Sequence, residues 1–104
     1  PQPAVKAFVE RWMKVYPGRE PGSEATYNYT AMMATASAMK LAGTTSDAMA
    51  IRAKLDAAIK VLPVAQHLAN YDGIDANGGS RIDTRVAVID GGKVKEVKLS
   101  ELAK

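Results

Sequence analysis

The 104-residue chain contains no cysteine and only one histidine, His67. The absence of cysteine excludes disulfide scaffolds, zinc ribbons and thiol nucleophiles, and a single histidine excludes sites built from two imidazoles. No apolar run approaches the ~18 residues that a membrane-spanning helix requires. The formal net charge is only +3, and the densest basic segment, residues 93–98, is interrupted by Glu96. This charge pattern does not favour binding to nucleic acid.

The rest of the composition is that of an ordinary folded domain. Hydrophobic residues make up 47% of the chain and charged residues 24%, which excludes a disordered tail. A chain of this length corresponds to one domain. We therefore look for one set of packed helices and strands.

Two segments have the apolar period and the end signals of amphipathic helices. Residues 4–16 carry an apolar stripe at helical spacing, and Pro17 ends the segment. The other segment is residues 46–61: the capping cluster 44–47 lies at its start, and Pro63 closes it. We expect both segments to bury one face.

Between these two, which are the first and the third helix along the chain, the sequence predicts a second helix that begins near Ser23 and ends before Gly43. We expect the Ser23 hydroxyl to cap its first free N–H groups, while Glu24 favours the positive end of the helix dipole. The segment 25–41 is rich in alanine and methionine and has few charges. This composition predicts a helix that is buried on most of its circumference.

The C-terminal third predicts a β-hairpin. The β-branched segment 85–89 and the segment 93–99 are joined by the turn sequence 90–92. We interpret 93–99 as a strictly alternating, half-exposed strand with Val94 or its partners on one side, and 100–102 as the start of a last helical turn. The residues between the third helix and this hairpin are expected to form a loop. The resulting fold class is α/β, with three helices followed by one hairpin.

No catalytic arrangement is visible, and we expect a protein without enzymatic activity and without a cofactor or metal. Asp72, Asp75 and Asn77 superficially resemble a calcium loop, but the spacing is wrong and the bidentate glutamate is missing. An Asx-type turn explains these residues better. We expect His67 to be a surface or hydrogen-bonded structural histidine rather than a ligand. Nucleotide-binding glycine loops and a nucleophile elbow are absent from the sequence.

Polar and aromatic residues gather at the start of the predicted second helix, among them Glu24, Tyr27 and Tyr29. One interpretation is structural, with buried rings whose hydroxyls reach the edge. The other is functional, with a pocket at the helix N-terminus, where free N–H groups attract an anionic ligand group. The residues alone favour the structural interpretation.

Four segments in order resemble the C-terminal portion of type I periplasmic binding proteins of the branched-chain amino acid (leucine/isoleucine/valine) family. They are FVERWMKVYPGREP, YTAMMATASAMKLAGTTSD, IRAKLDAAI and IDANGGSRI followed by VAVIDGGKVKEV. The sequence departs from the family at Thr30, where an acidic residue is usual, and in the stretch VLPVAQHLANYDG, where the family has a G-x-x-G pattern.

The resemblance implies that residues 1–104 are a single partial domain: the late helices of the C-terminal lobe, a crossover segment and a terminal hairpin of a two-lobed fold. It implies a solute receptor of an ABC importer, periplasmic or extracytoplasmic, whose partners are a membrane permease and the remainder of the same receptor chain. The expected ligand is an amino acid or a related carboxylated solute. The family's pattern also points to Glu24 and Tyr27 as ligand-binding residues.

Two other classes stay open from the residues alone. The chain is alternatively a free-standing helical domain that self-associates through its second helix. It is also compatible with a small enzyme domain that uses His67, Asp72 and Asp75.

Overall fold

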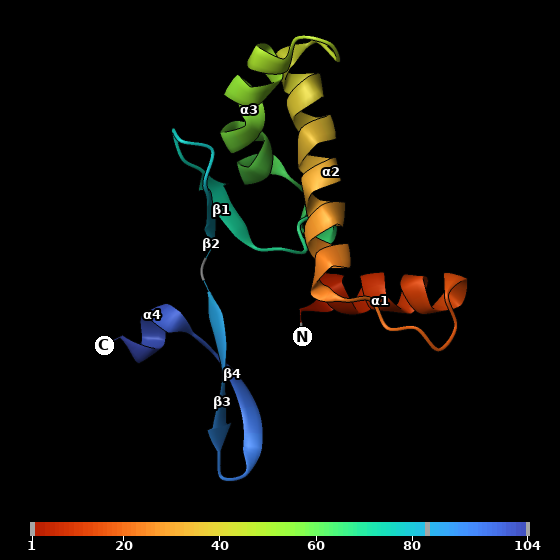
Figure 1. The fold of residues 1–104 in the computed structure, drawn as a ribbon, viewed down its shortest axis with the longest axis vertical. Coiled ribbons are helices and arrows are strands. Elements are labelled where there is room, and N and C mark those ends of the chain that lie inside the picture. Colours follow the sequence, from red (N-terminus) through yellow and green to blue (C-terminus); the bar gives the residue numbers. More distant parts are fainter. Residues whose placement is uncertain (1, 83, 104) are drawn as a thin grey trace.

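Three helices form the N-terminal part of the computed structural model, which describes residues 2–82 and 84–103. The helices are α1 (Pro3–Val15), α2 (Ser23–Ala42) and α3 (Ala48–Val61), and a 3₁₀ turn, η1 (Val64–Gln66), follows α3. α2 and α3 lie side by side, whereas α1 lies across the N-terminal end of α2 (Figure 1). The three helices predicted from the sequence are therefore confirmed.

Two helix ends follow the local signals in the sequence. Asp47 caps α3 by accepting a hydrogen bond from the Ala50 N–H at 3.1 Å, and Gly43 ends α2 in the left-handed conformation, with φ 68°. The expected cap at Ser23 is wrong. Gly22 occupies the cap position with extended backbone, no side chain caps the helix, and Ser23 is already helical.

The core lies between α2, α3 and the strand that follows them. Ala34, Ile59 and Leu62 form a buried cluster, and three partly buried side chains pack against it: Met33, Tyr71 and Ile74. The alanines at the helix contact, Ala38 and Ala58, are completely buried, because small residues allow two helices to approach closely.

The prediction that α2 is buried on most of its circumference is wrong for the chain as described. Of this helix, only Thr30, Ala34 and Ala38 are buried, and they lie along one stripe at helical spacing. Met32 is 71% exposed. Since α3 covers a single face of α2, apolar side chains on the opposite side of the helix, such as Met32, lie on the surface.

The segment expected to be a loop contains a second hairpin, so that part of the prediction is wrong. β1 (Tyr71–Ile74) pairs antiparallel with β2 (Ser80–Ile82), with an irregularity between Tyr71 and Gly73, and β1 packs against α3. These strands have four and three residues and contain aspartate and glycine. Such short, polar segments carry little strand propensity, and packing on α3 compensates for this.

The predicted C-terminal hairpin is confirmed: β3 (Arg85–Asp90) pairs antiparallel with β4 (Lys93–Lys98), and α4 (Leu99–Leu102) is the expected last helical turn. The strict alternation predicted for β4 is wrong: Val94 is 75% exposed, and Val97 is the partly buried residue of this strand. Residues three apart in a strand lie on opposite faces, so β4 does not alternate strictly.

The two hairpins form separate sheets, and β3–β4 extends away from the helices (Figure 1). The radius of gyration is 16.1 Å, whereas a compact domain of this length has about 13 Å. The accessible surface is 7475 Å², against about 5,700 Å² for a compact protein of the same mass. Among the described helices, none is long and apolar enough to cross a bilayer.

Candidate functional site

A buried hydroxyl on α2 anchors the segment that leads from η1 to β1. The Thr30 side chain is fully buried, and its Oγ1 accepts hydrogen bonds from the N–H groups of Leu68 at 3.0 Å and Ala69 at 3.1 Å. The same hydroxyl donates to the Thr26 carbonyl oxygen at 3.0 Å. All hydrogen-bonding capacity of this group is used within the protein, and the chain just before β1 is thereby fixed against α2.

The residue after this anchor adopts an unusual backbone conformation. Asn70 has φ 54°, and it is the one non-glycine residue in the described part of the chain with a positive φ. Asparagine tolerates this conformation better than most residues. Its side chain is oriented by Gln2, whose Nε2 donates to the Asn70 Oδ1 at 2.9 Å. The N-terminus of α1 and the start of β1 therefore meet at Asn70.

Two polar cavities adjoin at this point, and both are lined by Asn70 and Arg85. We call the first, of about 330 Å³, the junction cavity. Its polar lining comes from the residue before α1, the segment after η1, β1 and the two strands of the C-terminal hairpin. These residues are Gln2, His67, Asn70, Asp72, Arg85 and Lys98. The second, of about 290 Å³, lies beside the N-terminal end of α2 and includes Ser23 and Tyr27.

The junction cavity brings two cations together at the base of a hairpin. Arg85 and Lys98 are direct partners in the β3–β4 register. Like charges directly opposite each other on a hairpin are destabilising. Arg85 also forms an ion pair with Glu96, in which Nη1 and Oε2 are 3.9 Å apart and both side chains are exposed, so this pair contributes little to stability.

His67 lines the same cavity. Its ring centroid lies 6.3 Å from that of Tyr71. Its Nε2 is buried and has no hydrogen-bond partner within residues 2–82 and 84–103. The expectation of a surface or hydrogen-bonded histidine is therefore wrong for this nitrogen, and an unpaired buried polar group costs about 1–3 kcal/mol.

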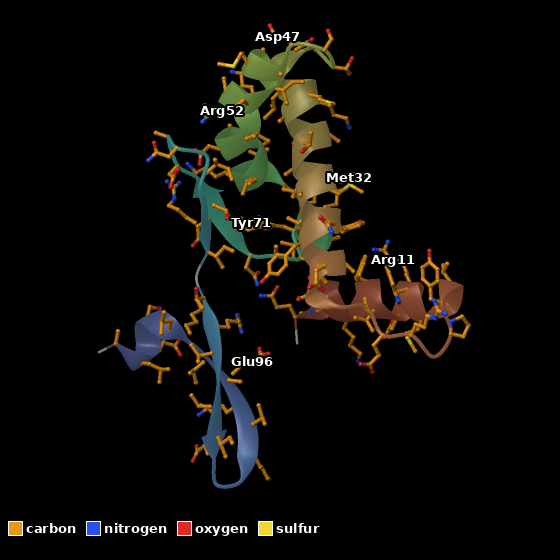
Figure 2. All side chains as sticks on the ribbon, viewed as in Figure 1. Arg11, Met32, Asp47, Arg52, Tyr71 and Glu96 are labelled. Carbon is orange, nitrogen blue, oxygen red and sulfur yellow. The ribbon has the colours of Figure 1, made fainter. Side chains whose placement is uncertain are left out.

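Burial raises the pKa of the neighbouring Tyr71 hydroxyl, and Tyr27 adds to this effect. Figure 2 shows Tyr71 on the side of β1 that faces α2.

The two residues that the resemblance points to lie at the N-terminal end of α2. Tyr27 is 45% exposed, its ring centroid lies 6.4 Å from that of Tyr71, and it lines the second cavity. Glu24 is exposed, its carboxylate lies over the Gly22 backbone, and it is not part of that lining. Tyr29 packs on Phe8 of α1, with ring centroids 5.2 Å apart. A binding role for Glu24 and Tyr27 stays a prediction.

Sequence reasoning missed most of the junction cavity. Gln2, Asn70, Arg85 and Lys98 come from four separate segments, and no spacing rule joins them. The strand register of the predicted hairpin was the one available signal, since it places Arg85 opposite Lys98.

The turn between β1 and β2 is an Asx-type turn, as predicted. The Asp75 Oδ1 accepts hydrogen bonds from the N–H groups of Asn77 at 2.9 Å and Gly79 at 2.8 Å. Two backbone donors thus use Oδ1 of Asp75, as an Asx turn requires. In the described part of the chain, no three histidine or acidic side chains converge in a way that would hold a metal ion, so His67, Asp72 and Asp75 do not form a metal centre there.

Asp56 of α3 connects this helix to both strands of the β1–β2 hairpin. Its Oδ2 lies 2.6 Å from the Lys60 Nζ, and its Oδ1 accepts from the Ile74 N–H at 2.8 Å and from Arg81 Nη2 at 3.3 Å. The hydrogen bond from Lys60, followed by the bond from the Ile74 N–H, lowers the pKa of Asp56 below its ordinary value of 3.8. The carboxylate therefore attaches the β1–β2 hairpin to α3 in its ionised form.

This lowered pKa predicts a specific loss of stability in acid. Because the folded-state pKa lies below the unfolded one, the contribution of Asp56 is complete above about pH 4 and disappears as the pH falls through the folded-state value. We expect the wild-type free energy of unfolding to fall over this range more steeply than that of Asp56→Asn, measured by urea denaturation at a series of pH values. Asp90→Asn, at the exposed turn of the other hairpin, is the control. Parallel pH profiles for wild type and Asp56→Asn would contradict the assignment.

Comparison of the chain with protein-family models, with curated proteins and with solved structures gives no match. The class that the structure itself defines is a small mixed α/β domain. In its described residues it has four α-helices and two antiparallel hairpins, with a polar cavity where the helices and the C-terminal hairpin meet.

Proposed function

We propose that the chain is part of a solute-binding receptor of an ABC importer, similar to the branched-chain amino acid family, and contributes to its C-terminal lobe. The ligand is an amino acid or a related carboxylated solute held between two lobes. The observation that carries this proposal is the order of the four family-like segments along nearly the whole sequence. The receptor binds and releases its solute, and no covalent bond is made or broken.

The amount of exposed surface supports a partner lobe. The chain exposes 7475 Å², about 1,800 Å² more than a compact protein of its mass. A standard protein–protein interface buries about 1,600 Å² in total. Apolar side chains contribute to this surface on α2 and on the C-terminal hairpin, where Met32 is 71% and Ile89 81% exposed. A second lobe that packs against these elements would remove the excess.

The position of the predicted binding residues fits hinge closure. Glu24 and Tyr27 lie at an exposed end of α2, beside a small polar cavity. A second lobe that closes over this end would remove the solute from water, as in other receptors that close by hinge motion. In this arrangement one wall of the cleft comes from this chain and the opposite wall from the rest of the receptor.

Calorimetry tests the proposal. We expect the product of the complete reading frame to bind an amino acid with a Kd in the micromolar range or below. We expect residues 1–104 alone to bind none of a panel of amino acids more tightly than about 100 μM, because half of the contacts are missing. Micromolar binding of an amino acid to residues 1–104 alone would contradict the two-lobe arrangement.

A second candidate function, self-association, is favoured by one surface. An uncharged groove runs along α2 and consists of Asn28, Ala31, Met32, Thr35, Ala36 and Met39. Figure 2 shows Met32 on the side of α2 away from α3. Two copies that pair through this groove would cover part of the excess surface. Sedimentation of the same samples separates the candidates, since a concentration-dependent dimer of residues 1–104 favours self-association and a monomer favours the receptor.

A further inference from the structure

We propose that a groove between α2, α3 and the turn of the β1–β2 hairpin is a binding site for a zwitterion, an amino acid with a large apolar side chain. We call it the α3 groove. The site goes beyond the proposed function, because its lining shares no residue with the cavity beside Tyr27 and it requires no second lobe.

The α3 groove has the size and the lining of a small-molecule site. Its volume is about 710 Å³, within the range of roughly 300–1,000 Å³ that is usual for ligand pockets. Its apolar lining includes Met39 of α2, Ile51 and Leu55 of α3, and Ile74 of β1. All four side chains are only partly buried. An apolar ligand side chain that covers them would remove further apolar surface from water.

Two opposite charges lie at the hairpin end of the α3 groove. Arg52 lines the groove from α3, and its Nη2 donates to the Ala76 carbonyl oxygen at 3.3 Å, which holds the guanidinium at the turn (Figure 2). Asp75 lines the groove from the turn itself, and its Oδ1 is fixed by the N–H groups of Asn77 and Gly79. Both groups are therefore positioned by the fold before a ligand binds.

Both charged groups also keep hydrogen-bonding capacity for a ligand. Within residues 2–82 and 84–103, the other N–H groups of Arg52 and Oδ2 of Asp75 have no hydrogen-bond or ion-pair partner. A third charged residue of the lining, Asp56, is already bonded to two cationic side chains and to a backbone N–H. The ligand therefore meets one available cation, Arg52, and one available anion, Asp75, in the lining that the structure describes.

This pair of charges selects a zwitterion. A carboxylate matches the planar guanidinium of Arg52, and an ammonium group matches the carboxylate of Asp75. A simple carboxylate would be attracted by Arg52 but repelled by Asp75, and a simple amine would meet the reverse. An amino acid carries both charged groups on one carbon atom, which leaves its side chain for the apolar lining.

The test is a titration of the 104-residue chain with L-leucine, followed by the backbone N–H resonances of Ile74, Asn77 and Gly78 in NMR spectra. At constant pH and ionic strength, we expect a saturable shift with a midpoint of about 1–10 mM, because Arg52 and Asp75 are exposed to water. This midpoint lies above the limit of about 100 μM that we expect for this chain in calorimetry. The absence of a shift would therefore overturn the groove and leave the two-lobe receptor untouched.

Two related ligands test the chemistry of recognition. 4-Methylpentanoate is leucine without its amino group, and its midpoint is expected to be at least about threefold higher, because Asp75 then faces only a negative charge. Glycine has no side chain, and its midpoint is expected to be about tenfold higher. Binding of either compound as tight as that of leucine would contradict the proposal.

Charge-removing variants locate the site. Arg52→Gln is expected to raise the leucine midpoint at least about threefold. Asp75→Asn, which keeps an oxygen for the turn N–H groups, is expected to do the same and serves as the second variant should the first fail to fold. Lys54→Gln is the control, because Lys54 is exposed on the same helix but is not part of the lining. Equal midpoints in the wild type and in the folded groove variants would overturn the proposal.

Discussion

Replacing Thr30 by valine is expected to destabilise the protein by about 2–4 kcal/mol. Valine has nearly the same shape, but it lacks the hydroxyl that accepts hydrogen bonds from the N–H groups of Leu68 and Ala69. Both residues are buried, at 4% and 6% exposure, so water does not replace the missing acceptor. Two unsatisfied buried donors each cost roughly 1–3 kcal/mol. Urea denaturation followed by circular dichroism measures the change.

Thr35→Val is the matched control for this experiment. Thr35 lies on the same helix, and its hydroxyl donates to the Ala31 carbonyl oxygen at an exposed position. Its replacement is expected to change the free energy of unfolding by less than about 0.5 kcal/mol, because the carbonyl already has a helical partner and water is available. A Thr30→Ser variant keeps the acceptor and should lie between the two valine variants. Equal stabilities of Thr30→Val and Thr35→Val would refute the anchoring role.

Gly73→Ala is the second substitution with a large expected effect, about 2–3 kcal/mol. Gly73 is buried in β1 with φ 154°. An added Cβ would lie 2.5 Å from Oδ1 of Asp56 and would also collide with the Arg81 guanidinium. Asp56 would have to move, which breaks its hydrogen bond to the Ile74 N–H. The β1–β2 hairpin would thereby lose its attachment to α3.

Gly92→Ala separates the collision from backbone strain. Gly92 also has a positive φ, of 76°, but a Cβ there meets no atom within 4 Å. We expect it to cost only about 1 kcal/mol. Protection of the β1–β2 amides in hydrogen exchange should fall in Gly73→Ala and remain unchanged in Gly92→Ala. An unchanged exchange pattern in Gly73→Ala would show that the Asp56 contacts do not hold the hairpin.

The parts of the fold that were predicted correctly are those with strong local signals. α3 has a capping aspartate, an apolar face and a terminating proline, and the C-terminal hairpin has β-branched residues on both sides of a double-glycine turn. The β1–β2 hairpin was missed because its strands are short and polar and depend on a long-range contact. Asp56 supplies that contact from 18 residues earlier in the chain, and no local pattern reports it.

The candidate sites divide in the same way. The Asx turn at Asp75 was predictable, because an aspartate two residues before an Asn-Gly pair satisfies its own neighbouring N–H groups. The environment of Thr30 was not predictable, because in the sequence this residue stands out only as a departure from the resembled family. Its role depends on the return of residues 68 and 69 to the side of α2.

By itself, the sequence determined the identity and the approximate ends of the three long helices and of the β3–β4 hairpin, because hydrophobic period, caps and turns act over a few residues. Only the tertiary structure decided which face of α2 is buried, that β1 and β2 pair, and that Asn70, Arg85 and Lys98 line one cavity. These features depend on contacts between residues that are far apart in the chain. Such contacts depend on how the whole chain packs. Local propensities act over a few residues and do not determine which distant segments pack together.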